Sequence, residues 1–320
     1  MNKKDISQIS DWLKVIIKGS FDIELASSDA SFRTYYRISH NEGTDIVMYA
    51  PPNKESLTNV IKINSKLENA SITVPKIKKV NKEIGLILMS DFGNKIYLDN
   101  LNEETVFCLY TDAIDVIHNM QNNISVSDLD SFDIQEQKNE INLFIDWFLK
   151  KHIGYNDEKL NDMGINKILT DLIEKVDEIP KKFTHRDYHS RNLMLLEKGN
   201  PGVLDYQDAI IGPITYDLVS LLKDCYIKWD DELINKMSKT YFQRISDMNT
   251  SFDVFSYWFD ITGLQRHLKA IGIFSRLNYR DNKPSYMNDI PRTLGYVRET
   301  VSKYDELKEI KLVLDELRLE

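Results

Sequence analysis

The chain has 320 residues, 42% of them hydrophobic and 28% charged, which is the composition of an ordinary globular protein long enough to bury a large core. Its formal net charge of −9 at pH 7 argues against general nucleic-acid binding, because a phosphate backbone is held chiefly by clustered Lys and Arg. No apolar run approaches the length that crosses a bilayer, so we expect no membrane-spanning segment.

The first 90 residues predict a small sheet flanked by helices. Residues 5–18 carry apolar side chains at helical spacing, and Gly19 ends this pattern. The runs that follow predict a helix over 55–70 and strands over 21–25, 35–38, 45–50, 72–80 and 84–89. The last of these strands is almost wholly apolar, so we expect it to lie inside the sheet.

The middle of the chain predicts the beginning of a mainly helical region. Helical periodicity covers 103–122, 139–152 and 159–177, and a polar connection covers 128–137. We interpret the aromatic side chains on these helices as core residues. We therefore expect this part of the chain to supply structural helices and no catalytic residues.

The segment 183–208 contains three polar side chains whose types and spacing fit phosphoryl transfer. Asp187 closes a His-Arg-Asp triplet, Asn192 follows five residues later, and Asp205 stands thirteen residues after Asn192. Phosphoryl transfer requires an oriented acceptor hydroxyl and metal ions that neutralise negative charge. Asp187 is the candidate proton acceptor, and Asn192 and Asp205 offer the sparse oxygen ligation that Mg²⁺ prefers. The pattern H-R-D-x-x-x-x-N is complete.

Each of these residues also has a structural interpretation. Asp187 and Asp205 could cap a turn or close a salt bridge, although their joint spacing favours the chemical role. His185 and Arg186 could equally brace the loop without contacting a substrate.

The C-terminal third predicts further helices over 216–226, 230–244, 252–274 and 303–317. Arg266, His267 and Lys269 form a cationic cluster on the third of them. This cluster could bind a substrate, or it could be a solvated helix face.

Three stretches make the chain resemble the aminoglycoside phosphotransferase and choline kinase superfamily, relatives of the protein kinases. They are the segment 183–208 with its continuation 212–222, the string Ser28-Asp29-Ala30-Ser31-Phe32-Arg33, and the stretch 263–277. Within the superfamily they are most similar to the anomeric sugar kinases that act on N-acetylmuramate and N-acetylglucosamine. The resemblance extends over most of the chain.

This resemblance implies an α+β, bilobal protein-kinase-like fold. The N-lobe, residues 1–90, would hold an antiparallel sheet plus a helix, and the larger C-lobe, residues 91–320, would be mainly helical. ATP and Mg²⁺ are the implied cofactors, and the implied partner is a small-molecule sugar. Asp217 would accept backbone N–H groups of the catalytic loop.

The resemblance also implies roles for individual residues, with Asp187 as the base and Asn192 and Asp205 as metal ligands. The implied nucleotide contacts are Ser28, Ala30, Ser31, Phe32, Arg33, Met48, Met89, Ser90 and Asp91. Gln207 and Asp208 are candidate sugar contacts because they directly follow the metal ligand, and His185, Arg186 and Arg266 are further candidates.

The chain departs from the general kinase pattern at three places. The loop between the first two strands has no glycine, and an ordinary polar hairpin turn is the alternative for it. The third strand lacks the phosphate-binding lysine, so another cation must replace it, with Arg33, Arg37 and Lys54 as unranked candidates. Asp205 is followed by Tyr-Gln, whereas an Asp-Phe-Gly triplet at 91–93 comes too early to bind metal and is interpreted as the interlobe hinge.

The leading hypothesis is an ATP-dependent kinase that phosphorylates the anomeric hydroxyl of N-acetylmuramate or N-acetylglucosamine in peptidoglycan recycling. An aminoglycoside or other small-alcohol phosphotransferase is the first alternative, although the basic stretch 266–269 suits an acidic sugar better than a polycation. A non-catalytic nucleotide-binding module is the second, motivated by the missing lysine. A protein kinase is disfavoured because no Ala-Pro-Glu segment follows Asp205. The preferred sugar and the oligomeric state stay open.

The two cysteines bear on the cellular compartment. Cys108 and Cys225 show neither a disulfide framework nor metal-ligand spacing, and both lie in apolar stretches. They predict buried thiols in a reducing compartment. Because the amino terminus also lacks the apolar core of a secretory signal, we expect a cytoplasmic protein.

Overall fold

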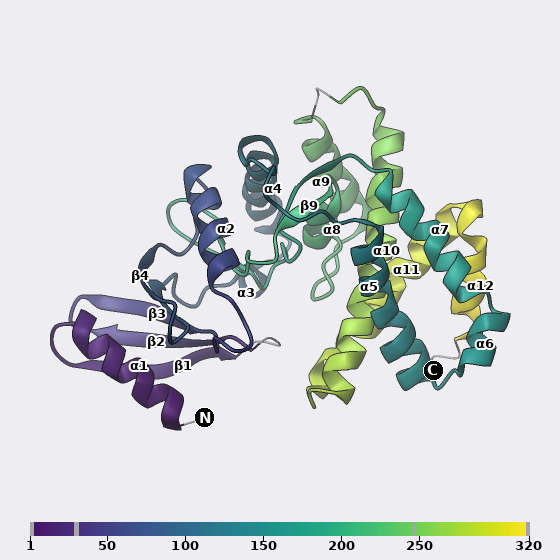
Figure 1. Cartoon of the computed structure of the whole chain (residues 1–320). Coiled ribbons are helices and arrows are strands. Elements are labelled where there is room, and N and C mark those ends of the chain that lie inside the picture. The colour runs from purple at the N-terminus through teal and green to yellow at the C-terminus, as the bar shows by residue number, and fades with distance from the viewer. Residues whose placement is uncertain (1–2, 29–31, 246–247, 318–320) are drawn as a thin grey trace.

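The computed structural model describes residues 3–28, 32–245 and 248–317, which form a sheet-based N-terminal part and a helical C-terminal part (Figure 1). The sheet is antiparallel, with the strand order β1-β2-β3-β5-β4. Its elements are α1 (Lys3–Ile16), β1 (Phe21–Ser28), β2 (Thr34–His40), β3 (Gly43–Tyr49), α2 (Thr58–Asn69), β4 (Ile77–Asn81) and β5 (Leu86–Ser90). The predicted small antiparallel sheet with its helix is confirmed.

Helices cover both faces of this sheet. Successive side chains of a strand point to opposite faces, so β5 contributes to two hydrophobic clusters. Leu86 and Leu88 join the cluster of α1, whereas Ile87 and Met89 join the cluster of α2. Burial on both faces explains the continuous apolar run of β5, and its place between β3 and β4 confirms that it lies inside the sheet.

The C-terminal part is built around α10 (Phe252–Tyr279), a helix of 28 residues (Figure 1). The other helices are α3 (Tyr97–Asn100), α4 (Val106–Asn123), α5 (Ile134–Leu143), the π-helix η1 (Phe144–Ile153), α6 (Asp157–Asp162), α7 (Ile165–Asp177), α8 (Tyr216–Leu222), α9 (Asp231–Phe242), η2 (Pro284–Asp289), α11 (Ile290–Lys303), η3 (Asp305–Leu307) and α12 (Lys308–Glu316). α10 packs against α5, η1, α8 and α11. At Gly272 a Cβ would lie 2.3 Å from the backbone carbon of Leu143, so only glycine allows α10 this close to the α5–η1 junction.

Two short antiparallel ladders lie between β5 and α8 in the chain. β6 (Lys181–Thr184) pairs with β9 (Ile210–Pro213), and β7 (Leu193–Met194) pairs with β8 (Gly202–Val203). They fix both ends of the loop 185–192 and the start of the segment that contains Asp205.

Several predicted helix bounds are wrong. The range 159–177 is broken at Gly164, whose φ of +64° separates α6 from α7. The range 139–152 is divided between α5 and η1, and α5 begins at Ile134, inside the predicted polar connection. The last helix begins at Lys308.

Cys225 is buried, Cys108 is exposed, and neither forms a disulfide. The prediction of a buried thiol is therefore wrong for Cys108, because this side chain lies on the solvent side of α4. Among the residues that the structure describes, no helix is long and apolar enough to cross a membrane.

Candidate active site

The loop 185–192 connects β6 to β7, and the β7–β8 ladder places its last residue beside Asp205. Leu193 lies opposite Val203, and Leu204 N donates a hydrogen bond to Asn192 O at 3.0 Å. Asn192 and Asp205, thirteen positions apart in the sequence, thus come to neighbouring backbone segments.

Asp217, at the start of α8, holds the beginning of this loop. Its Oδ2 accepts a hydrogen bond from His185 N at 2.7 Å, and its Oδ1 accepts one from Arg186 N at 3.1 Å. Arg186 has a φ of +76°, a strained conformation for a side-chain-bearing residue, and these bonds help to retain it. The predicted bracing role of Asp217 is confirmed.

Asp224 holds the middle of the same loop. Its Oδ2 accepts hydrogen bonds from both N and Oγ of Ser190, at 2.9 and 2.6 Å. Its Oδ1 accepts a third from Tyr226 N at 2.9 Å. Asp217 and Asp224 therefore fix the loop at two points.

Replacement of Asp217 by Ala is expected to destabilise the fold. The change leaves two buried backbone N–H groups without an acceptor, and each such loss costs about 1–3 kcal/mol. Chemical denaturation measures the effect, with Asp253→Ala, on an exposed residue of α10, as the control. An Asp217→Ala protein as stable as the control would contradict the bracing role.

Asp187 is partly exposed and follows the residues that Asp217 holds. Burial raises the pKa of this carboxyl, but the charge of Lys269, followed by the neighbouring histidines and Arg266, lowers it below its usual range. The carboxylate is therefore ionised at neutral pH and able to accept a proton. Asn192 Nδ2 donates to Asp187 O at 3.0 Å, which links the candidate base to a candidate metal ligand.

Asn192 and Asp205 offer a sparse set of oxygen donors. Because Asn192 Nδ2 is engaged by Asp187 O, its amide oxygen is left as the acceptor for a cation. Asp205 has a φ of +60°, and its Oδ1 accepts a hydrogen bond from Gln207 Nε2 at 2.9 Å. Two protein oxygens, completed by phosphate and water, fit Mg²⁺. Within the described part of the chain, no cluster of three His, Cys, Asp or Glu side chains forms a richer metal site.

A cavity of about 320 Å³ lies between the sheet and this segment. Met48 of β3 and Met89 of β5 line one side, and Asn192 and Asp205 line the other. Ser90 and Asp91, which follow Met89 directly, line it too. The structure thus brings four predicted nucleotide contacts and both predicted metal ligands to one cavity, whose size suits a small-molecule site.

The other predicted nucleotide contacts belong to the loop after β1. Ser28 is the last residue of β1, and Ala30 and Ser31 lie outside the described residues. Phe32 is 58% exposed, and Lys54 Nζ lies 4.0 Å from the centre of its ring. Lys54 is thus engaged by an aromatic face.

The two arginines proposed to replace the missing lysine have different partners. Arg33 Nη1 lies 3.7 Å from Asp205 Oδ1, and its Nε pairs with Glu55 at 2.5 Å. Arg37 instead pairs with Asp91, with 2.6 Å between Nε and Oδ2. Arg33 is therefore the one that contacts a candidate metal ligand.

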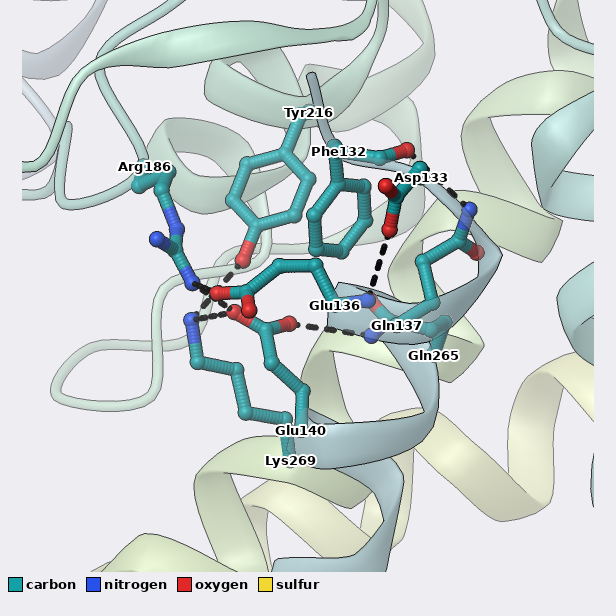
Figure 2. Close-up of polar contacts among 9 residues, drawn as sticks. All are labelled: Phe132, Asp133, Glu136, Gln137, Glu140, Arg186, Tyr216, Gln265 and Lys269. Carbon is teal, nitrogen blue, oxygen red and sulfur yellow. Dashed lines mark hydrogen bonds and ion pairs between the residues drawn. The ribbon is translucent and has the colours of Figure 1, made fainter. Parts of the chain in front are cut away.

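Arg186 ties the loop to α5, and through Glu140 of that helix to α10 (Figure 2). Its Nη2 pairs with Glu136 at 2.8 Å and with Glu140. Glu140 is also contacted by Lys269, at 2.7 Å, and by Gln265, at 3.0 Å. The charge of Arg186 is thus used within the protein, which favours the bracing interpretation of this residue.

The remaining predicted sugar contacts occupy different environments. His185 is fully buried, which lowers its pKa to about 4, and its Nδ1 accepts a hydrogen bond from Asp187 N at 3.3 Å. Gln207 lines the cavity and donates hydrogen bonds to Asp205 and to the exposed Asp208, at 2.9 and 3.1 Å. Arg266 is 6% exposed, so the alternative of a solvated helix face is wrong at this position.

Sequence reasoning missed three residues around the loop. Asp224 and Glu140 lie far from it in the sequence, and no local pattern marks them as its partners. Arg191 lines the cavity, and its guanidinium carbon lies 3.6 Å from the centre of the Tyr226 ring. Its place directly before Asn192 was the available signal.

The sequence pattern of the phosphotransferase enzyme family matches residues 22–249. The chain belongs to this family. The match includes both sides of the cavity and every residue from Asp187 to Asp224. The chain is therefore a phosphotransferase, an enzyme of the class that its catalytic segment predicted.

Relatives of this phosphotransferase include the N-acetylmuramate/N-acetylglucosamine kinase of Neisseria meningitidis serogroup B, 35% identical over 97% of this chain and 95% of the relative. The N-acetylmuramate/N-acetylglucosamine kinase of Pseudomonas aeruginosa is 38% identical over 91% of this chain and 87% of the relative. The predicted resemblance to this branch is confirmed.

Solved structures similar to this phosphotransferase include a choline kinase from Streptococcus pneumoniae, with a TM-score of 0.66 and 11% identity over 93% of this chain and 100% of that one. An ADP-bound aminoglycoside phosphotransferase has a TM-score of 0.61 and 17% identity over 94% and 99% of the two chains. At such identities the likeness concerns the fold alone, and it confirms the predicted bilobal architecture.

Proposed function

We propose that this phosphotransferase transfers the γ-phosphoryl group of ATP to the anomeric hydroxyl of N-acetylmuramate and N-acetylglucosamine. The observation that carries the proposal is the hydrogen bond from Asn192 Nδ2 to the backbone oxygen of Asp187, because Asn192 lines a cavity together with Asp205. The lowered pKa of Asp187 agrees with a role as proton acceptor. The names of relatives 35% and 38% identical over most of the chain support these sugars as acceptors.

Asp187 acts as the base on the sugar hydroxyl. A hemiacetal hydroxyl is more acidic than an ordinary alcohol, so a carboxylate of low pKa suffices to take its proton as the phosphoryl group transfers. Asp217 and Asp224 keep the loop in place, so the carboxylate needs little reorganisation at that moment.

The cavity holds the nucleotide. Met48 and Met89 offer apolar walls to the adenine ring, and backbone groups of residues 89–91 pair with its edge. Asn192 and Asp205 would hold Mg²⁺, which would supply charge neutralisation for the phosphate oxygens. Gln207 and Asp208 follow the metal ligand and face the sugar side.

Arg33 takes over the role of the missing strand lysine. Protein kinases pair that lysine with a glutamate of a helix, and Arg33 similarly pairs with Glu55, just before α2. From this position its guanidinium reaches from Asp205 towards the nucleotide phosphates.

Replacement of Arg33 by Met is expected to raise the KM for ATP about tenfold, because one charge-assisted contact with phosphate is lost. The KM for the sugar should change less than threefold. Initial-rate kinetics with each substrate varied in turn checks this, with Lys54→Met as the matched control. An unchanged KM for ATP would show that another cation holds the phosphates.

A panel of acceptors tests the proposed function. ADP release by the purified protein with ATP and Mg²⁺ is measured for N-acetylmuramate, N-acetylglucosamine, kanamycin and choline. We expect turnover only with the two sugars. Transfer to kanamycin but not to the sugars would make the aminoglycoside alternative correct, and no release with any acceptor would support a non-catalytic module.

The product would be a sugar 1-phosphate for cell-wall recycling. We place this activity in the cytoplasm, where ATP is available and where the two unpaired cysteines would stay reduced.

A further inference from the structure

Arg266 of α10 is a buried cation without a carboxylate at ion-pairing distance among the described residues. It is 6% exposed, and the polar contact of its guanidinium is Cys225 Sγ, 3.8 Å from Nη1. Its other guanidinium nitrogens have no protein partner within the described ranges, yet they are not sealed from solvent. Burying an ionised group without a counter-charge is costly, so this arrangement fits a ligand that supplies the anion.

The cations next to Arg266 are already neutralised. Lys269, three residues further along α10, lies 2.7 Å from Glu140, and Arg186 pairs with both Glu136 and Glu140 (Figure 2). Two carboxylates thus face two cations in this cluster. An incoming anion therefore gains little electrostatic attraction from this neutralised cluster. At Arg266 the same anion would be the first counter-charge at ion-pairing distance.

Arg266 also lies beside the segment that positions the catalytic loop. Cys225, which it contacts, follows Asp224, whose carboxylate is fully engaged by Ser190 and Tyr226. One turn further along α10, Lys269 reaches Glu140, which pairs with Arg186 of the catalytic loop. Arg266 thus lies on a part of α10 that adjoins the loop carrying Asp187, where a charged substituent of the bound sugar would approach it.

We propose that Arg266 binds the lactyl carboxylate of N-acetylmuramate and makes the enzyme favour this acidic sugar over N-acetylglucosamine. The inference rests on the proposed function, in which both sugars present their anomeric hydroxyl to Asp187. The two sugars share the acetamido group and differ in the 3-O-lactyl group, so a carboxylate contact affects one of them alone. A guanidinium offers paired N–H donors that match a carboxylate.

The test compares kcat/KM for the two sugars in the wild type and in the Arg266→Gln and Arg266→Lys variants. Arg266→Gln is expected to lose about tenfold to a hundredfold on N-acetylmuramate and less than about threefold on N-acetylglucosamine. Arg266→Lys, which keeps the charge, should retain part of the preference. Arg292→Gln is the matched control, since Arg292 reaches the backbone of Cys225 at 2.7 Å but has its own carboxylate, Asp289, at 3.0 Å. It should leave the ratio of the two sugars unchanged.

A second measurement keeps the wild-type fold and changes the substrate. The substrate is N-acetylmuramate whose lactyl carboxylate is converted to the primary amide. With the wild type, its kcat/KM should fall below that of N-acetylmuramate by the same factor as Arg266→Gln causes. With Arg266→Gln, the acid and the amide should have nearly the same kcat/KM. Equal losses on both sugars, or an amide used as well as the acid, would overturn the assignment of Arg266. If the wild type phosphorylated neither sugar, the proposed function would fail, which is a different outcome.

Discussion

Asp187→Asn is expected to lower kcat for sugar phosphorylation by about 10²–10⁴-fold, the contribution typical of a positioned general base. The amide keeps the size of the side chain but cannot take the proton of the acceptor hydroxyl. The backbone bonds around the loop come from Asp217 and Asp224, so the fold and the cavity should persist. Stopped assays of sugar phosphate formation measure kcat.

The control for this variant is Asp253→Asn, on the exposed first turn of α10, which should keep wild-type turnover. We expect ATP to raise the thermal stability of the wild type and of Asp187→Asn by similar amounts. A kcat within threefold of the wild type would remove Asp187 from the chemistry, and a protein without an ATP response would show that the change acts through the fold.

Asp205→Asn is expected to lower turnover about 10³-fold, because metal-ion charge stabilisation contributes several kcal/mol and each 1.36 kcal/mol is a factor of ten. Of the two candidate metal ligands, Asn192 and Asp205, Asp205 is the one with a carboxylate. Its neutral replacement should therefore also raise the Mg²⁺ concentration needed for half-maximal activity. Titration of activity with Mg²⁺ measures both effects.

Asp208→Asn serves as the neighbouring comparison, because its exposed carboxylate is assigned to the sugar and not to the metal. This variant should keep the Mg²⁺ dependence of the wild type. An unshifted Mg²⁺ titration in Asp205→Asn would contradict the metal role of Asp205.

Local patterns were sufficient for much of the fold. Hydrophobic periodicity in the sequence predicts the strands of the sheet and the helices α2, α4 and α10, and tertiary contacts reinforce these elements. The failures have local physical reasons. Gly164 interrupts the helix over 159–177, and its residue type was a visible signal. The α5–η1 junction, in contrast, depends on contact with Gly272 of another helix.

The same division applies to the site. Asp187, Asn192 and Asp205 share one short segment, so their spacing marked them as a unit. The pairing of Arg33 with Glu55 and its approach to Asp205 connect residues from two lobes, and no local pattern encodes such a contact. The burial of Arg266 could not be predicted either, because a cationic stretch of a helix is expected to face solvent unless the positions of the neighbouring helices are known.

The most direct test of the account is the position of the phosphate in the product. The protein is incubated with ATP, Mg²⁺ and N-acetylmuramate labelled with ¹³C at the anomeric carbon, and the product is examined by ³¹P and ¹³C NMR. We predict a sugar phosphate whose anomeric carbon is split by coupling to phosphorus. Phosphate on another oxygen, or ATP consumption without sugar phosphate, would contradict transfer to the anomeric hydroxyl.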